Sequence, residues 1–371
     1  MRVSRTQCRH FNGDRPCKPH KKFSYTCPTC PEYIPITSHI LIIKLDAVGD
    51  VERTTGLLQP LLQKYPGAAI TWVTKKNALP LFKNNPHVYQ IIEYGPEAQL
   101  NLLTSTYDLA INLDAAEDSC RLMTIAAAEK KIGYGWNPKG YAEPLNPEAE
   151  DWFEMGLWDD VKKANQRTYQ DIMMEICGLE GRMTRPVFVL DDKERAFADE
   201  FAFRNQVNRN VPVFGLNTGA GGRWVHKKWT MEGYQSLIEH LEQLYPESSI
   251  LLYGGPEEVE RNGQLASAGK NVIDTGCDND LREFGALVNL CDLMVTGDTL
   301  AMHIALALEK KLVVLFGPTS AAEIDLYGSG VKVVPQGMDC LCCYRPDCEI
   351  RPTCMERISV EDVLAAIREQ L

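Results

Sequence analysis

The sequence predicts an α/β protein with two domains, each built on a parallel sheet. Short apolar runs alternate with helical patterns over residues 39–135, and the alternation resumes over residues 211–316. Such alternation is typical of β-α-β units. In residues 293–319, two apolar runs flank a helical pattern, and each run ends in a turn with Gly and Thr. Because ligands of open parallel sheets bind at the carboxyl ends of strands, these turns indicate a ligand site. An ordinary β-α-β crossover with a capped helix is the alternative.

A similar turn lies near the start of the chain. The apolar run 40–45 is followed by a turn that contains Gly49 and Asp50, and a helical pattern comes next. With one such turn early and one late, the simplest architecture is two Rossmann-like domains that face each other across a cleft.

The composition is that of a globular protein. Its 371 residues are enough for about two domains, with 44% hydrophobic and 24% charged residues. No apolar run approaches the roughly 18–20 residues of a membrane span, and the N-terminus has no signal-peptide core, so we expect a cytoplasmic protein. The net charge of −11 argues against non-specific nucleic-acid binding.

The first 36 residues differ from the rest of the chain. Seven Lys/Arg against two Asp/Glu give this segment a net charge of +5 and leave −16 to the remainder. The segment also holds four cysteines. We therefore expect a small Cys-rich module at residues 1–36, a first Rossmann-like domain at 37–190 and a second at 191–371.

The expected elements follow from the local patterns. In the first domain the predicted strands are residues 40–45, 69–73, 89–92 and 109–113, with a helix at 56–64. In the second they are residues 211–216, 250–253, 271–273, 293–295 and 312–316. A charged helix at 191–205 is expected to enter the second domain, and Ser359 is a good N-cap for a final helix. Residues 136–165 are aromatic and contain Pro, which predicts a long irregular loop.

Thirteen cysteines are present, and most of them form two groups. Grouped cysteines in a reducing compartment bind metal more often than they form disulfides, and thiolates favour zinc or iron. Unligated thiols are the alternative. The predicted structural metal ligands are Cys8, Cys17, Cys27 and Cys30 in the first group, and Cys340, Cys343, Cys348 and Cys354 in a finger at 340–354. The predicted core thiols are Cys120, Cys177, Cys277 and Cys291.

Four stretches of the sequence carry a family resemblance. They are residues 42–66, residues 215–241, residues 251–258, and residues 297–308 together with 313–319. In this order and spacing they resemble glycosyltransferase family 9, the ADP-heptose glycosyltransferases, over roughly residues 38–371. The resemblance implies a GT-B fold and an inverting, metal-independent transfer of heptose or a related sugar from an ADP-sugar to an acceptor hydroxyl. It implies no catalytic cofactor.

Asp50 is the predicted catalytic base. It follows Gly49 just past the first strand, and it matches the Asp of the family's Gly-Asp motif. Partial burial raises the pKa of a carboxyl group, which suits general-base catalysis, so we expect a raised pKa here. An Asp that caps the first helix is the alternative interpretation.

The predicted stabiliser of the leaving diphosphate is Lys227, which matches the family's Lys two residues before a Trp. A point positive charge suits a developing diphosphate charge, and the adjacent Lys228 is the rival. Asp298 or Thr299 is expected to cap a helix whose backbone N–H groups face the diphosphate. His303 matches the family pattern one turn further on, although a lone His in an apolar helix is more often a packed core residue.

Residues that follow two strands complete the predicted donor site: Thr218, Gly219, Gly254, Gly255, Pro256 and Glu258. Glu258 is the candidate ribose contact. The chain departs from the family at Leu300, where a Gly is usual, and at residues 46–47, where small hydroxyl residues are usual. These departures leave the donor sugar open.

The acceptor is also open. The acidic body slightly favours a protein or soluble acceptor over a lipopolysaccharide core, and residues 136–165 are expected on the acceptor side or as a surface excursion. The autotransporter heptosyltransferases, a protein-modifying branch of the family, have a comparable C-terminal cysteine finger that holds iron. The sequence does not decide whether the protein forms a homo-oligomer.

The alternative function is a catalytically silent GT-B scaffold that acts as a metal-stabilised binding or assembly protein. A Rossmann oxidoreductase is disfavoured, because no G-x-G-x-x-G follows the first strand.

Overall fold

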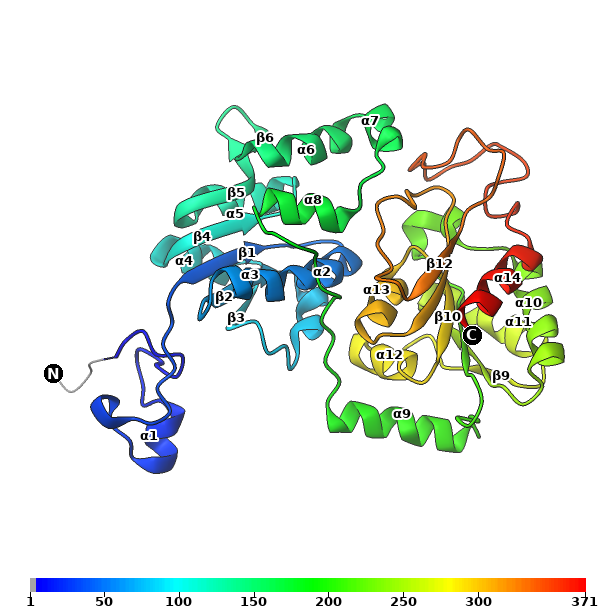
Figure 1. Cartoon of the computed structure of the whole chain (residues 1–371), viewed down its shortest axis with the longest axis horizontal. Coiled ribbons are helices and arrows are strands. Elements are labelled where there is room, and N and C mark those ends of the chain that lie inside the picture. Colours follow the sequence, from blue (N-terminus) through cyan, green and yellow to red (C-terminus); the bar gives the residue numbers. More distant parts are fainter. Residues whose placement is uncertain (1–4) are drawn as a thin grey trace.

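The computed structural model describes residues 5–371, apart from the side chains of residues 223–225. This part of the chain forms two six-stranded sheets, with strand orders β3-β2-β1-β4-β5-β6 and β12-β11-β10-β7-β8-β9 (Figure 1). Helices cover the sheets, and both sheets are parallel except for one edge strand of the first. The predicted α/β architecture with two Rossmann-like halves is confirmed.

The strands β1 and β2 of the first sheet are apolar and buried on both faces, as is usual inside parallel sheets. Its strands are β1 (His39–Ile43), β2 (Ala69–Thr74), β3 (Gln90–Glu93), β4 (Thr106–Asn112), β5 (Ala127–Asn137) and β6 (Tyr141–Pro144). The helices between them are α2 (Val48–Thr54), α3 (Leu58–Lys64), α4 (Pro96–Thr104) and α5 (Glu117–Ile125).

The second sheet repeats this plan. Its strands are β7 (Phe214–Asn217), β8 (Ile250–Tyr253), β9 (Val272–Asp274), β10 (Leu293–Gly297), β11 (Lys311–Leu315) and β12 (Gly330–Val333). Its helices are α10 (Met231–Leu244), α11 (Val259–Ala266), α12 (Leu281–Val288), α13 (Leu300–Ala307) and α14 (Val360–Gln370). The helix expected near residue 191 is α9 (Asp192–Arg204), and its N-cap Asp191 forms a capping box with Glu194. The Ser359 hydroxyl caps α14 as expected.

Residues 136–165 are not the irregular loop that the sequence predicts. They form a β5–β6 hairpin, then α6 (Glu150–Leu157) and α7 (Asp159–Ala164), and α8 (Tyr169–Ile176) follows. The aromatic residues hold these short helices in place: the Trp152 ring lies edge-on to Tyr169, with 5.4 Å between centroids, and Phe153 stacks on Tyr134 at 6.0 Å. The prolines lie at the ends of these elements: Pro138 follows β5, Pro144 ends β6 and Pro147 begins a short 3-10 helix.

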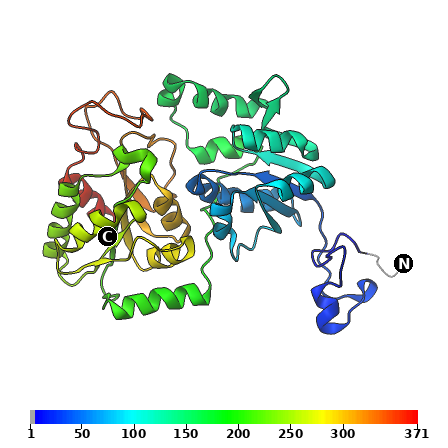
Figure 2. The ribbon, with the colours of Figure 1, turned by 180° about the vertical axis from the view of Figure 1, so that it is seen from behind.

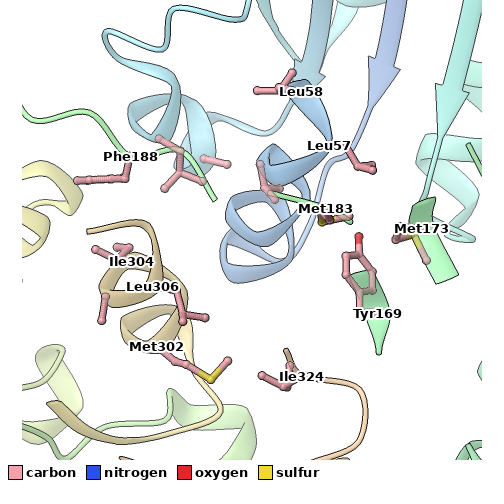
Figure 3. Packing of buried hydrophobic residues seen from close by; sticks show 14 of the residues in the cluster. Leu57, Leu58, Tyr169, Met173, Met183, Phe188, Met302, Ile304, Leu306 and Ile324 are labelled. Carbon is pink, nitrogen blue, oxygen red and sulfur yellow. The ribbon is translucent and has the colours of Figure 1, made fainter. Parts of the chain in front are cut away.

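One hydrophobic cluster joins the two domains. Met302, Ile304 and Leu306 of α13 belong to the same buried cluster as Leu57 and other residues of the first domain. Figure 3 shows α13 beside a helix of the first domain and labels side chains of the cluster on both. Because apolar burial of this kind is a large favourable term, it holds the two sheets in one relative arrangement.

The Cys-rich module lies apart from the second domain in both views (Figure 1, Figure 2). It contains α1 (Lys18–Phe23) and the short 3-10 helix η1 (Cys27–Thr29). The Arg9 side chain donates to the carbonyl of Ala68 at the beginning of β2, so the module sits at the amino end of the first sheet. Within the described part of the chain, no helix is both long enough and apolar enough to cross a membrane.

Candidate active site

A cleft of about 930 Å³ lies between the two domains. Its walls are the turns at the carboxyl ends of the parallel strands, together with residues of α6, α7 and the C-terminal cysteine finger. The volume is near the upper end of the roughly 300–1,000 Å³ that small-molecule sites occupy. The turns after β1 and β10, which the sequence singled out, both line it: Ala47, Val48, Gly49 and Asp50 from one side, and Asp298, Thr299, Leu300 and His303 from the other.

At Gly49 the two domains approach each other closely at the cleft. A Cβ atom added to Gly49 would lie 3.1 Å from Cδ2 of His303 and 3.5 Å from Cα of Leu300. The N-terminal ends of α2 and α13 therefore meet here, one from each domain. Partial positive charge at both helix ends favours an anionic ligand between them.

Asp50 is the third residue of α2, and its carboxylate is engaged from two sides. Oδ2 accepts a hydrogen bond from the backbone N–H of Ala47 at 3.4 Å, and Arg53 Nη2 lies 2.8 Å from Oδ1. Burial raises the pKa of the Asp50 carboxyl. The charges of Arg53 and Lys44, together with weaker contributions, lower this pKa by more than burial raises it, so it lies below its usual value. The expectation of a raised pKa is wrong, because Arg53 stands one helical turn further along the same face.

A second cation lies beneath this turn. Lys44, at the end of β1, is buried and forms an ion pair with Asp114, whose other oxygen accepts from the backbone N–H of Leu45 at 2.8 Å. Although burial opposes it, Asp114 and Asp50 raise the pKa of Lys44, so this side chain stays charged. Sequence reasoning missed Lys44 and Arg53, although both are within six residues of Asp50 in the chain.

The two adjacent lysines have different partners. Lys227 Nζ donates to the carbonyl of Asp298 at 3.0 Å and lies 3.1 Å from the Asp298 carboxylate. Lys228 instead forms an ion pair with Glu258 and lies 3.8 Å from Glu257. The structure thus places Lys227, and not Lys228, at the N-terminal end of α13.

Neither predicted cap of α13 makes a capping hydrogen bond. Thr299 occupies the N-cap position without a side-chain cap bond among the described residues, and its hydroxyl accepts from Asn217 Nδ2 at 3.3 Å. Asp298 is held by Lys227 instead; burial raises its pKa, but Lys227 outweighs this and keeps the pKa low. Thr299 is thus the N-cap residue, as expected, but its hydroxyl is engaged by Asn217 and forms no capping bond to a described residue.

His303 is nearly buried, with 5% of its surface exposed. Its Nδ1 has no hydrogen-bond partner among the described residues. Burial and the neighbouring Arg53 lower the pKa of His303 to about 4, so the imidazole is neutral at neutral pH. A neutral imidazole with a free nitrogen in the cleft wall can bind a hydroxyl or a phosphate oxygen.

The Gly-rich turns after β7 and β8 are braced by Glu258. A Cβ atom on Gly219 would lie 2.7 Å from Glu258 Oε2, and one on Gly254 would lie 2.6 Å from the Glu258 Cβ. Glu258 also accepts from the backbone N–H of Gly255 at 3.0 Å. Gly219, Gly254, Gly255, Pro256 and Glu258 line the cleft as expected. Thr218 does not; its hydroxyl points into the fold and donates to Asn262 Oδ1 at 2.6 Å.

The cleft contains residues for which the sequence offered no motif. They come from segments far apart in the chain and include Trp152, Lys162, Asn217, Glu323 and Tyr344. Asn217 ends β7 and bridges to the hydroxyl of Thr296 at 3.0 Å, so it connects the turns after β7 and β10. The others reach the cleft only through tertiary packing.

The cysteines of the two groups are not among the described residues that line the cleft. Burial raises the pKa of the Cys354 thiol to about 11, and the thiols of Cys340, Cys343 and Cys348 are near enough to contribute. Among the described residues, no three His, Cys, Asp or Glu side chains are grouped closely enough to hold a metal ion. The metal sites therefore stay predictions. The four predicted core thiols are all buried.

Comparison with known proteins agrees with this architecture. The family model for glycosyltransferase family 9 (heptosyltransferase) matches residues 99–353. Lipopolysaccharide heptosyltransferase 2 of Escherichia coli is 24% identical over 309 residues, which covers 76% of this chain and 83% of that protein. Lipooligosaccharide heptosyltransferase 2 of Haemophilus ducreyi is 28% identical over 311 residues, covering 76% and 84%.

Solved structures show the same fold. A glycosyltransferase family 9 protein from Veillonella parvula has a TM-score of 0.75 at 19% identity, and the match covers 90% of this chain and 97% of that one. The iron-containing dodecameric glycosyltransferase TibC of enterotoxigenic E. coli has a TM-score of 0.52 at 12% identity, covering 90% and 76%. This chain belongs to glycosyltransferase family 9 and is a glycosyltransferase of GT-B fold.

Proposed function

We propose that this protein transfers heptose, or a closely related sugar, from an ADP-sugar to an acceptor hydroxyl with inversion and without a catalytic metal. One observation carries the proposal: Asp50 and the Lys227–Asp298 pair lie on opposite walls of one cleft. The two walls are close enough to interact electrostatically, because the charge of Arg53 lowers the pKa values of Asp50, Asp298 and His303. The names of the related heptosyltransferases support the choice of donor.

The residues divide the reaction between the two domains. Asp50 accepts the proton of the acceptor hydroxyl as its oxygen forms a bond to the anomeric carbon. The bond between that carbon and the diphosphate oxygen breaks on the opposite face, so the configuration inverts. The negative charge that develops on the diphosphate is met by Lys227 and by the N–H groups of α13. The low pKa of Asp50 keeps the base deprotonated, and nearby Arg53 makes it a weaker base than an isolated carboxylate.

The donor lies along the edge of the second sheet. Its nucleoside is expected at the turn after β8 and beside Cys277, Asp278 and Phe284, which line that end of the cleft. Its diphosphate is expected between the turns after β7 and β10, where Gly219 and Gly221 leave the backbone accessible. The acceptor enters from the first domain, beside Asp50 and Trp152. Because the body of the chain is acidic, a protein or soluble acceptor is slightly favoured over a lipopolysaccharide core.

We further propose a structural metal in the C-terminal cysteine finger. Cys354 is buried against Gly317, where an added Cβ atom would lie 2.5 Å from its Sγ, and the other three thiols of the quartet are electrostatic neighbours. Four thiols suit zinc or iron, and a bound ion would cross-link the two ends of the finger to each other. The four thiols of the N-terminal module are half-exposed, and a structural metal there is proposed from the cysteine grouping alone.

The proposed function is tested by a transfer assay and by calorimetry with purified protein. ADP-heptose should bind saturably, and ADP should be released in the presence of EDTA. Asp50→Asn should lower kcat by roughly 10²–10⁴-fold while the Kd of ADP stays unchanged. The matched control is Asp199→Asn, which removes an exposed carboxylate that also pairs with an arginine, Arg209, at 2.7 Å.

Two results would overturn the assignment. An absence of saturable binding by ADP and ADP-heptose would favour the silent scaffold. Unchanged turnover in Asp50→Asn would remove Asp50 from its role as the base. Because TibC of enterotoxigenic E. coli is a dodecamer, sedimentation of the same sample would show whether this chain also assembles.

A further inference from the structure

The C-terminal cysteine finger contributes one aromatic residue, Tyr344, to the cleft. Two backbone hydrogen bonds attach the finger to the loop after β11: Cys342 N–H to Gly317 C=O at 3.1 Å, and Tyr344 N–H to Pro318 C=O at 2.9 Å. Cys342 and Tyr344 both have left-handed backbone conformations, with φ of 58° and 50°. This sharp turn directs the Tyr344 ring to the cleft wall, where Lys162 of α7 lies 4.4 Å from the ring centroid.

The hydroxyl of Tyr344 is fixed to the loop after β11. It accepts from the backbone N–H of Ser320 at 3.2 Å and donates to Oε1 of Glu323 at 3.2 Å. The backbone of Glu323 is fixed in turn, since its carbonyl accepts from the N–H of Tyr169 at 2.8 Å, across the domain boundary. Glu323 is therefore held by contacts from two other segments of the chain, the cysteine finger and the beginning of α8.

The environment of Glu323 is unusual for a carboxyl group. Only 7% of the residue is exposed, yet it lines the cleft. Within the described part of the chain no lysine, arginine or histidine nitrogen lies within 4 Å of it, so it is not one half of a salt bridge. Burial raises the pKa of the Glu323 carboxyl, and Arg53 and Lys162 act against this from a distance. Since a buried carboxylate has room for several hydrogen bonds, a single tyrosine leaves most of its acceptor capacity for a ligand.

The strand order tells which part of a ligand reaches Glu323. The strands of the second sheet run β11-β10-β7-β8. The nucleoside is expected after β8 and the diphosphate between the turns of β7 and β10, so the loop after β11 is next along the same edge. In an ADP-sugar the group beyond the diphosphate is the sugar that is transferred. Asp50 and Arg53 approach this position from the first domain, and the charge of Arg53 acts on both Glu323 and Asp298.

We propose that Glu323, positioned by the Tyr344 hydroxyl, binds hydroxyl groups of the transferred sugar and so determines which ADP-sugar the enzyme accepts. The inference rests on the proposed function and deepens it. A carboxylate is well suited to this task, because its two oxygens accept from two neighbouring hydroxyls and such charge-assisted bonds are strong. Tyr344 does not contact the reacting atoms; it is a positioning residue, and through it the cysteine finger becomes part of the sugar site.

The test compares a donor that carries a sugar with one that does not. Calorimetry with ADP-heptose and with ADP alone, on wild type and Glu323→Gln, separates the sugar contact from the nucleotide contacts. We expect Glu323→Gln to raise the Kd of ADP-heptose by about tenfold or more and to leave the Kd of ADP within about twofold. We expect Tyr344→Phe to show the same pattern at a smaller magnitude. Both variants should also discriminate less between ADP-heptose and ADP-mannose. The control is Glu349→Gln, which changes an exposed glutamate of the same finger.

The outcomes separate the inference from the proposed function. If wild type binds neither ADP nor ADP-heptose, both fail. If wild type binds ADP-heptose but Glu323→Gln weakens ADP-heptose no more than ADP, the sugar contact is refuted while the proposed function stands. A higher KM for the acceptor with unchanged donor affinity would also refute it, since Glu323 would then serve the acceptor. Thermal melting of each variant identifies a loss that comes from unfolding, and Tyr344→Phe keeps the test valid if Glu323→Gln does not fold.

Discussion

The carboxylate of Asp50 and the guanidinium of Arg53 form an ion pair within α2, with 2.8 Å between Oδ1 and Nη2. Arg53 is itself held in place, because its guanidinium carbon lies 3.7 Å from the ring centroid of Tyr169. The pair points into the cleft from the first domain, opposite Asp298 and His303. A cation this close keeps the proposed base deprotonated, so the pH dependence of the reaction depends on Arg53.

Arg53→Met should move the acid limb of the kcat/KM profile to higher pH. Arg53 lowers the pKa of Asp50, and the base is active only when deprotonated. Activity is therefore present above the pKa of Asp50 and is lost as pH falls through it, so removal of the cation brings that loss to a higher pH. Initial rates measured across the acidic range test this. Arg121→Met, which removes an exposed arginine paired with Glu117, should leave the profile in place. An acid limb that does not move in Arg53→Met would contradict the role of the pair.

Lys227→Ala and Lys228→Ala should have different consequences, although the residues are adjacent. Lys227 lies at the N-terminal end of α13, so its loss should lower kcat by roughly 10²–10³-fold. Lys228 pairs with the buried Glu258, so its loss should mainly lower the melting temperature and raise the KM of the donor. Steady-state kinetics and thermal melting of both variants separate the two effects. Equal losses of kcat in the two variants would contradict the proposal that Lys227 stabilises the leaving diphosphate.

Glu52→Gln should flatten the dependence of stability on pH. Glu52 is fully buried, and neither carboxyl oxygen has a hydrogen-bond partner among the described residues. Burial raises its pKa well above the usual value, and Arg282 opposes this only in part. A raised folded-state pKa contributes stability that is present below the unfolded pKa and is lost as pH rises through the folded one.

Melting temperatures from about pH 5 to about pH 8 test this. Wild type should lose stability towards the upper end, and Glu52→Gln should lose less, since glutamine does not titrate. Glu200→Gln, in an exposed ion pair of α9, should follow wild type. A variant as sensitive to pH as wild type would show that Glu52 is not the titrating group.

Arg282→Met should destabilise the junction between the domains. The Arg282 side chain donates from Nε to Glu194 Oε1 at 2.8 Å and from Nη2 to Oε2 at 2.7 Å, and Nη1 reaches the carbonyl of Pro80 in the first domain at 3.3 Å. Lys83 Nζ remains 2.8 Å from Glu194 Oε1, so the cost should lie below the roughly 3–5 kcal/mol of a fully unpaired buried charge. The Arg282 and Lys83 side chains lower the pKa of Glu194 to about 2, so the stabilisation is present above the unfolded pKa and is lost as pH falls towards that value. The double variant Arg282→Met, Glu194→Met should recover much of the melting temperature; no recovery would argue against an uncompensated charge as the cause.

Metal analysis tests the cysteine finger. Purified protein should contain zinc or iron, and a chelator should lower the melting temperature because the finger loses a cross-link. Cys343→Ser should lower the metal content, whereas Cys277→Ser, a buried thiol elsewhere, should not. Protein that holds no zinc or iron when purified under reducing conditions would refute the proposed ligands.

The sequence by itself determined the parts that depend on local pattern. Continuous apolar runs rich in β-branched residues, such as residues 40–43, are typical of strands buried on both faces, and the small and polar residues after them indicate the turns at the carboxyl ends. These patterns were sufficient to predict two parallel sheets, the capping of α14 by Ser359, and a cleft that contains Gly49, Asp50 and Asp298. Strands β5, β6 and β12 escaped prediction because their residues are largely exposed or half-exposed and show little apolar periodicity.

Only the tertiary structure decided which side chains share an environment. Lys227 and Lys228 have the same chemistry and adjacent positions, so nothing local could tell which one faces Asp298. The low pKa of Asp50 depends on a cation whose side chain is fixed by Tyr169, more than a hundred residues away in the chain. Tyr344 reaches the cleft, and meets Glu323, only because the cysteine finger folds back on the loop after β11. The apolar period of a sequence reports which face of an element is buried, and the partners across that face are set by long-range packing.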